Sequence, residues 1–172
     1  MKKTILTIML AMAAMLSLQA QTPTGMWVSY VVDEEAQEAL GHVLNFQGNQ
    51  VRQGLSAASE MGGVGTITLL FFAPAQEYAP STKIINFQFD PAQVDMRLSD
   101  IEFIDELKNA IKENPAKEEE LKQIVYNALA PNKDQMAKEG LLSGKYTIVS
   151  ATDTKLVLKD PEGESMTFIR PE

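Results

Sequence analysis

The stretch KIINFQFDPAQVDMRL, residues 83–98, alternates apolar and polar side chains on both sides of an Asp-Pro pair. Every second residue is apolar from Ile85 to Phe89 and again from Val94 to Leu98. A period of two is typical of strands that bury one face. Because Asp90 and Pro91 interrupt the pattern, we predict two half-buried strands joined by a hairpin turn at this pair.

Runs rich in β-branched and aromatic residues continue the strand pattern on both sides of this stretch. Upstream they cover residues 25–32, 41–46, 50–55 and 66–72, and downstream three shorter runs follow Gly144. Between the two sets, apolar residues recur every three or four positions from Phe103 to Leu129, which is the period of amphipathic helices. A further short helix is expected around residues 134–138. The chain is thus predicted to carry a helical insert at about residues 102–140, between about six strands and three more.

These elements predict a mainly β fold. Consecutive short strands separated by turns favour an antiparallel meander, and a sheet hides its two edges most simply by closing into a barrel. We therefore expect an up-and-down antiparallel β-barrel with the helical insert before its last strands. The same pattern also allows an α+β arrangement, in which a curved antiparallel sheet carries the helix pair on one face.

The first twenty residues have the order of a secretory signal peptide. Lys2 and Lys3 precede an apolar run from Ile5 to Leu18, which is short for a membrane span, and Ala20 offers a small residue for cleavage. We expect cleavage after Ala20, which leaves residues 21–172 as a single domain in the periplasm or outside the cell. The chain has no cysteine, so we expect neither disulfides nor a lipid-modified cysteine as a membrane anchor.

Composition and motifs argue against several classes of function. The chain holds 23 acidic and 15 basic residues, a net charge of −8, so nucleic acid is not an expected partner. The sequence has no Gly-x-Ser-x-Gly motif and no cluster with the spacing of metal ligands. We therefore expect no enzymatic activity, no metal and no other cofactor. The one histidine, His42, is expected at the surface or at a strand end.

The two ends of the predicted domain carry a family resemblance. Gly25-Met26-Trp27 opens the first strand, and Arg170 lies on the last strand in phase with Met166 and Phe168. In these features the chain resembles the lipocalin-like proteins of the calycin superfamily, and its closing strands look like those of small exported bacterial members. The resemblance implies a cup-shaped barrel in which the final basic residue packs over the tryptophan as a cation–π pair. The helical insert departs from the family pattern.

The expected function is that of an exported binding protein without enzymatic activity, and the expected ligand is a small hydrophobic molecule inside the barrel. Tyr146 or Arg170 would orient this ligand. The predicted ligand-binding residues are Trp27, Phe87, Phe89, Met96, Tyr146, Phe168 and Arg170. The alternative is a protein–protein interaction or inhibitor module, in which the same side chains fill the core. An apolar cavity open to solvent would favour the first function, and a filled core with an exposed apolar patch would favour the second.

Overall fold

The computed structural model describes residues 22–33 and 38–171. The predicted signal peptide and its cleavage point lie outside the described residues. Among the described helices, none is long and apolar enough to cross a membrane. The described chain is mainly β, as the sequence predicts.

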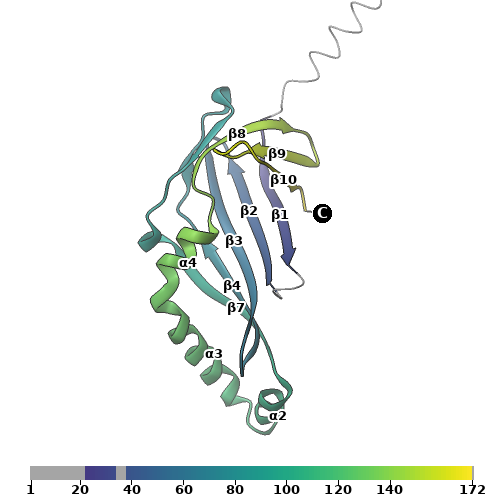
Figure 1. Ribbon diagram of the computed structural model, residues 1–172, viewed down its shortest axis with the longest axis vertical. Helices are drawn as coiled ribbons and strands as arrows, with labels where there is room; N and C mark the ends of the chain where they lie inside the picture. Colours follow the sequence, from purple (N-terminus) through teal and green to yellow (C-terminus); the bar gives the residue numbers. More distant parts are fainter. Residues whose placement is uncertain (1–21, 34–37, 172) are drawn as a thin grey trace, which may run out of the picture.

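The strands of the described chain form one antiparallel sheet (Figure 1). In chain order they are β1 (Gly25–Asp33), β2 (Glu38–Gln47), β3 (Gln50–Met61), β4 (Gly65–Phe72), β5 (Gln76–Glu77), β6 (Ile84–Phe87), β7 (Asp95–Phe103), β8 (Gly144–Ala151), β9 (Lys155–Lys159) and β10 (Ser165–Ile169). Across the sheet the order is β6-β8-β9-β10-β1-β2-β3-β4-β7, and β5 pairs with the start of β3. Two meanders, β1–β4 and β8–β10, therefore meet where β1 pairs with β10.

The predicted hairpin at Asp90 and Pro91 is wrong. β6 pairs with β8 and β7 pairs with β4, so these consecutive strands lie at opposite ends of the sheet. The alternation itself is correct for each strand, because Ile85 and Phe87 are buried in β6 and Met96 is buried in β7. A period of two identifies the buried face of a strand but does not identify its neighbour.

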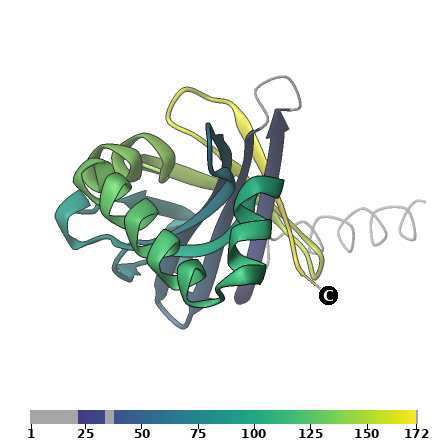
Figure 2. The same ribbon diagram turned by 90° about the horizontal axis from the view of Figure 1, so that it is seen from below.

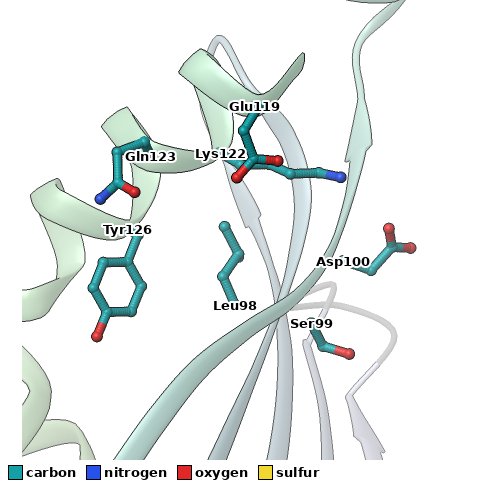
Figure 3. A pocket seen from close by; sticks show the side chains of 7 residues that line it. All are labelled: Leu98, Ser99, Asp100, Glu119, Lys122, Gln123 and Tyr126. Carbon is teal, nitrogen blue, oxygen red and sulfur yellow. The ribbon is translucent and has the colours of Figure 1, made fainter. Parts of the chain in front are cut away.

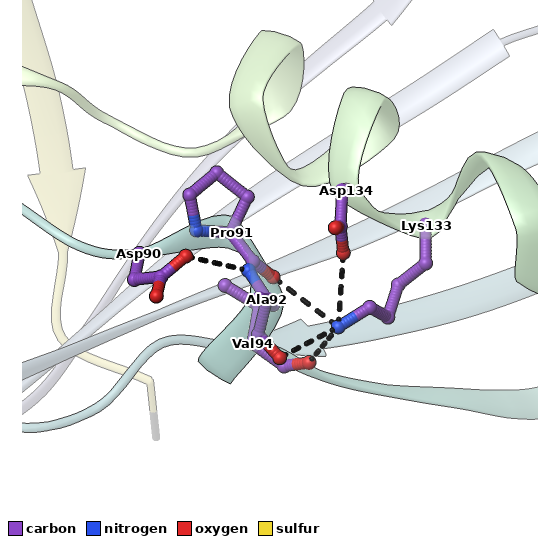
Figure 4. A network of polar contacts seen from close by, with 6 residues as sticks. All are labelled: Asp90, Pro91, Ala92, Val94, Lys133 and Asp134. Carbon is purple, nitrogen blue, oxygen red and sulfur yellow. Dashed lines mark hydrogen bonds and ion pairs between the residues drawn. The ribbon is translucent and has the colours of Figure 1, made fainter.

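The segment between β6 and β7 is held by the helical insert (Figure 4). Asp90 accepts a hydrogen bond from the Ala92 N–H at 3.0 Å and caps the 3₁₀ turn η2 (Pro91–Gln93). Lys133 Nζ donates to the carbonyl oxygens of Pro91, Ala92 and Val94 at 3.2, 3.1 and 3.0 Å, and it lies 3.1 Å from Asp134 Oδ1. A charged donor thus binds three carbonyl groups, which fixes this segment in a crossing instead of a hairpin.

The expectation of a closed barrel is not confirmed, because the sheet is open. In the part of the chain that the structure describes, the end strands β6 and β7 do not pair with each other. The helices α2 (Asp105–Glu113), α3 (Ala116–Leu129) and α4 (Lys133–Gly140) lie on one face of the sheet (Figures 1 and 2). Val125 of α3 and Ala137 of α4 are buried against β4 and β7. The open sheet corresponds to the second arrangement that the sequence allows.

A buried glutamine fixes the link between the helices and the last strands. Gln53 of β3 is only 2 % exposed. Its Nε2 donates to the Leu142 carbonyl oxygen and its Oε1 accepts from the Leu142 N–H, both at 2.9 Å. The side-chain amide thus satisfies both backbone groups of a buried residue. This contact holds the chain that leads from α4 into β8 against the middle of the sheet.

Candidate functional site

The two ends of the domain, which carry the family resemblance, meet at one contact. Trp27 is fully buried at the start of β1. Arg170, which directly follows β10, holds its guanidinium carbon 4.7 Å from the centroid of the indole ring. Both side chains donate to the Thr24 carbonyl oxygen, Trp27 Nε1 at 3.1 Å and Arg170 Nη2 at 2.9 Å. The predicted cation–π pair is therefore present, and the shared carbonyl fixes both partners.

Three more of the predicted ligand-binding residues lie in the same core as Trp27. Phe87, Tyr146 and Phe168 belong to one cluster of buried side chains from both meanders. The rings of Phe87 and Tyr146 pack edge to face with centroids 5.3 Å apart. Burial raises the pKa of the Tyr146 hydroxyl. These side chains contact one another, which is the packing of a filled core.

The remaining predicted residues lie apart from this cluster. Met96 is buried and Phe89 is half-buried. Both lie on the face of the sheet that carries the helices, near β4, β7 and α4. Arg170 is exposed except for its contact with Trp27. The structure thus divides six of the seven predicted residues between two packed clusters, leaves Arg170 exposed beside Trp27, and does not gather the seven around one pocket.

The hollows on the described surface lie elsewhere. One of about 420 Å³ is open to solvent between β7 and α3, where Leu98, Lys122 and Tyr126 approach it (Figure 3). Four others have volumes of about 450, 110, 370 and 400 Å³. None of these five is lined by any of the seven predicted ligand-binding residues.

We call the face of β10 and β1–β4 that lies opposite the helices the outer face. The centre of this face is uncharged. The strand register arranges its outward residues in three neighbouring rows. The first row is Ile169, Val28, Val43, Gly54 and Phe72; the second is Tyr30, Gly41, Ser56 and Leu70; the third is Ala39, Ala58 and Thr68. Within β10 and β1–β4, none of the residues in these three rows is charged, although the chain carries a net charge of −8.

Two aromatic rings on the outer face lie over glycines. Tyr30 is 67 % exposed, and a Cβ atom at its cross-strand neighbour Gly41 would lie 2.8 Å from its ring. Phe72 is 36 % exposed, and a Cβ atom at Gly54 would lie 3.3 Å from its ring. The missing side chains at Gly41 and Gly54 leave room for both rings to approach the strand backbone. The result is a smooth apolar surface that remains open to solvent.

These outward residues are not among the predicted site residues. The sequence does contain a signal for them, because Val28 and Tyr30 make the second face of β1 apolar beside Trp27. Strands with two apolar faces are usually covered on both sides. Gly41 and Gly54 inside strands are a further signal, since strand glycines often mark a close approach of another group.

The prediction that His42 lies at the surface or at a strand end is wrong. The side chain lies inward in the middle of β2, between Ser29 of β1 and Leu55 of β3, and is 9 % exposed. Its Nδ1 is buried without a hydrogen-bond partner in the described part of the chain. Burial lowers the pKa of the imidazole from its ordinary value of 6.5, because the charged form loses hydration.

We expect this histidine to make the folded protein less stable in mild acid. Below pH 6.5 the unfolded chain binds a proton at His42 while the folded chain, with its lower pKa, does not. The free energy of unfolding therefore falls as the pH decreases from 6.5 towards the lowered pKa of the folded protein. Below that pKa both states bind the proton, and His42 lowers the free energy of unfolding no further. Urea unfolding of the wild type and of His42→Leu between pH 8 and pH 5 measures the difference. Equal pH slopes for the two proteins would contradict the prediction.

Comparisons with known proteins provide no relative from which to argue. No protein-family model, no curated protein and no solved structure matches the chain. The function is therefore argued from the surface and the core alone.

Proposed function

We propose that the protein is an exported, non-enzymatic binding module that binds another protein through the outer face of β1–β4 and β10. The observation that carries this proposal is the uncharged outer face, with Tyr30, Phe72 and Ile169 exposed on it. Apolar patches of this kind on a soluble domain commonly mark a protein-binding surface. Tyrosine and phenylalanine are also enriched in the centres of protein interfaces.

The packing of the core supports a protein partner over a small ligand. The side chains expected to surround a hydrophobic molecule contact one another in two clusters. A ligand inside the sheet would have to displace Phe87, Tyr146 or Phe168, and each displaced ring would lose its own buried contacts. The outer face requires no such rearrangement.

The contact of Trp27 with Arg170 supports a relation of this domain to the calycin superfamily. In this proposal the domain is an open variant, in which the helical insert packs on the β4–β7 side of the sheet. Export and the lack of enzymatic activity remain proposals that rest on the N-terminal sequence and on the absence of catalytic motifs from it.

Photo-crosslinking tests the proposed surface. Benzoylphenylalanine in place of Tyr30 puts a reactive ketone on the outer face with little change in side-chain shape, and the same group in place of Val149 on β8 is the matched control. Both native side chains are exposed. Irradiation in the cell envelope of the native host is expected to give protein adducts at position 30 and few at position 149. Equal yields at both positions, or none at position 30, would remove the proposal.

Native mass spectrometry of gently purified protein separates the rival function. We expect a mass equal to that of the chain alone. A lipid-like molecule retained in repeated preparations would instead support a ligand inside the domain, and its loss in a Phe168→Trp variant would place it in the core.

A further inference from the structure

The central strand of the outer face carries opposite charges at its two ends. On β3 the outward residues are Arg52, Gly54, Ser56, Ala58 and Glu60 in strict alternation. Arg52 and Glu60 are exposed, and neither forms an ion pair within the described chain. Both lie four residues from Ser56, or about 13 Å along the strand. Between them are only small side chains.

We propose that the partner at the outer face is a second copy of this chain, related by a two-fold axis that crosses β3 at Ser56. This inference rests on the proposed function, since it names the protein that the outer face binds. An axis in the plane of the interface and perpendicular to β3 places the β3 strands of the two protomers antiparallel to each other. Arg52 of each protomer then faces Glu60 of the other, and two equivalent ion pairs form.

The charges also select this arrangement over the other two-fold arrangement. An axis parallel to β3 would place Arg52 against Arg52 and Glu60 against Glu60, and like charges at an interface are repulsive. The three uncharged rows allow two copies with a net charge of −8 to approach here without burying an acidic residue.

The sizes of the side chains fit the same axis. The axis follows the middle row, which contains Tyr30 and Ser56, so each outer row meets the other outer row of the partner. Phe72 and Val43 of the first row thereby face the smaller Thr68 and Ala39 of the third row. In the outer rows, large against small is the pattern that allows two sheet faces to interdigitate at about 10 Å. In the middle row each side chain meets its own copy, so Tyr30 packs against Tyr30 and Leu70 against Leu70.

A hollow on the outer face lies where the partner's carboxylate would arrive. It has a volume of about 370 Å³ and is lined by Arg52, Phe72 and Arg97 among others. The Arg97 guanidinium stacks over the Phe72 ring at 5.5 Å and pairs with Asp95. Because the Asp95 carboxylate lines the same hollow and already pairs with Arg97, the Arg52 guanidinium is the group beside the hollow that is left to bind the carboxylate of Glu60 from a second copy.

The available area predicts a weak dimer. Five strands at about 4.8 Å spacing and about 26 Å of β3 give a contact of roughly 600 Å² per protomer, or roughly 1,200 Å² in total. This is the low end of the range for specific interfaces. We therefore expect dissociation constants of about 1–100 µM, a range in which protein concentration controls the dimer.

Sedimentation velocity over about 1–300 µM tests the proposal on the mature protein. The wild type is expected to pass from monomer to dimer. Arg52→Glu and Glu60→Arg are each expected to weaken the dimer by about tenfold or more, because each change creates two like-charge contacts. The double variant with both changes restores opposite charges and is expected to recover most of the wild-type affinity. Lys145→Glu on β8 makes the same change in net charge as Arg52→Glu, outside the strands of the proposed interface, and should leave the dimer unchanged.

Each outcome decides between the two proposals. A wild type that stays monomeric at every concentration, or a double variant that is as weak as the single variants, overturns the two-fold dimer. Thermal unfolding of each variant shows whether a loss of dimer comes from a loss of folding. If the dimer is absent but benzoylphenylalanine at position 30 still captures a different protein in the native envelope, only this inference fails. If position 30 captures nothing, the proposed function fails as well.

Discussion

Replacing Trp27 by alanine is expected to lower the free energy of unfolding by about 3–5 kcal/mol, the usual range for removing a buried aromatic side chain. The indole is fully buried in the larger core, its Nε1–H donates to Thr24, and its face holds the Arg170 guanidinium. Alanine removes all three contacts and leaves a cavity between β1 and the last strands. Equilibrium unfolding in urea, followed by far-ultraviolet circular dichroism, measures the loss.

Two variants separate the contributions around this tryptophan. Trp27→Phe keeps an aromatic ring but removes the N–H donor, so a smaller loss than that of alanine is expected. Arg170→Met keeps an apolar stem beside the ring and removes the charge; because Arg170 is exposed, we expect a loss of about 1 kcal/mol or less. A loss below about 1 kcal/mol for Trp27→Ala would show that this contact does not hold the two ends of the sheet together.

Gln53→Leu is expected to destabilise the protein by about 2–4 kcal/mol. Leucine fills a similar volume, but the N–H and the carbonyl oxygen of Leu142 lose their partners while they remain buried. Each buried backbone group without a hydrogen bond costs about 1–3 kcal/mol. The added apolar side chain recovers part of that loss, which keeps the total below the simple sum.

Gln50→Leu on the same strand is the matched control. Gln50 is exposed at the start of β3, and its replacement should change the free energy of unfolding by no more than about 0.5 kcal/mol. Amide hydrogen exchange gives a local measurement for the first variant, because the Leu142 N–H should exchange faster in Gln53→Leu than in the wild type. Similar losses in both variants, or unchanged exchange at Leu142, would contradict the role given to Gln53.

The sequence predicts the faces of the strands well, since side-chain alternation is a local property. Phe87, Met96, Tyr146 and Phe168 are inward as expected. The pairing of Trp27 with Arg170 is present as the resemblance to lipocalin-like proteins implies. The helical insert is also close to its predicted range of residues 102–140, because its apolar residues recur at helical spacing.

The neighbours of the strands are not local properties, and the sequence predicts them less well. Asp90 and Pro91 predict a turn, but the direction of the chain after it depends on Lys133, some forty residues later. The closed barrel fails for a related reason, because closure would require the end strands β6 and β7 to pair with each other, and in the described chain β6 pairs with β8 while β7 pairs with β4. Gln53 gives no sign in the sequence of its contact with Leu142, since a single polar residue among apolar ones does not identify its partner.

Some strands pair with the next strand in the chain and others with distant strands, and this difference affects the order in which the protein folds. Within β1–β4, each strand pairs with the next one along the chain and the four can form soon after they emerge, but β6 has no neighbour in the sheet until β8 is available. The environment of Trp27 is completed still later, because Arg170 and Thr24 are 146 residues apart. Contacts between such distant residues slow folding. In the export that we propose, the chain would therefore stay incompletely folded until its last strand has crossed the membrane.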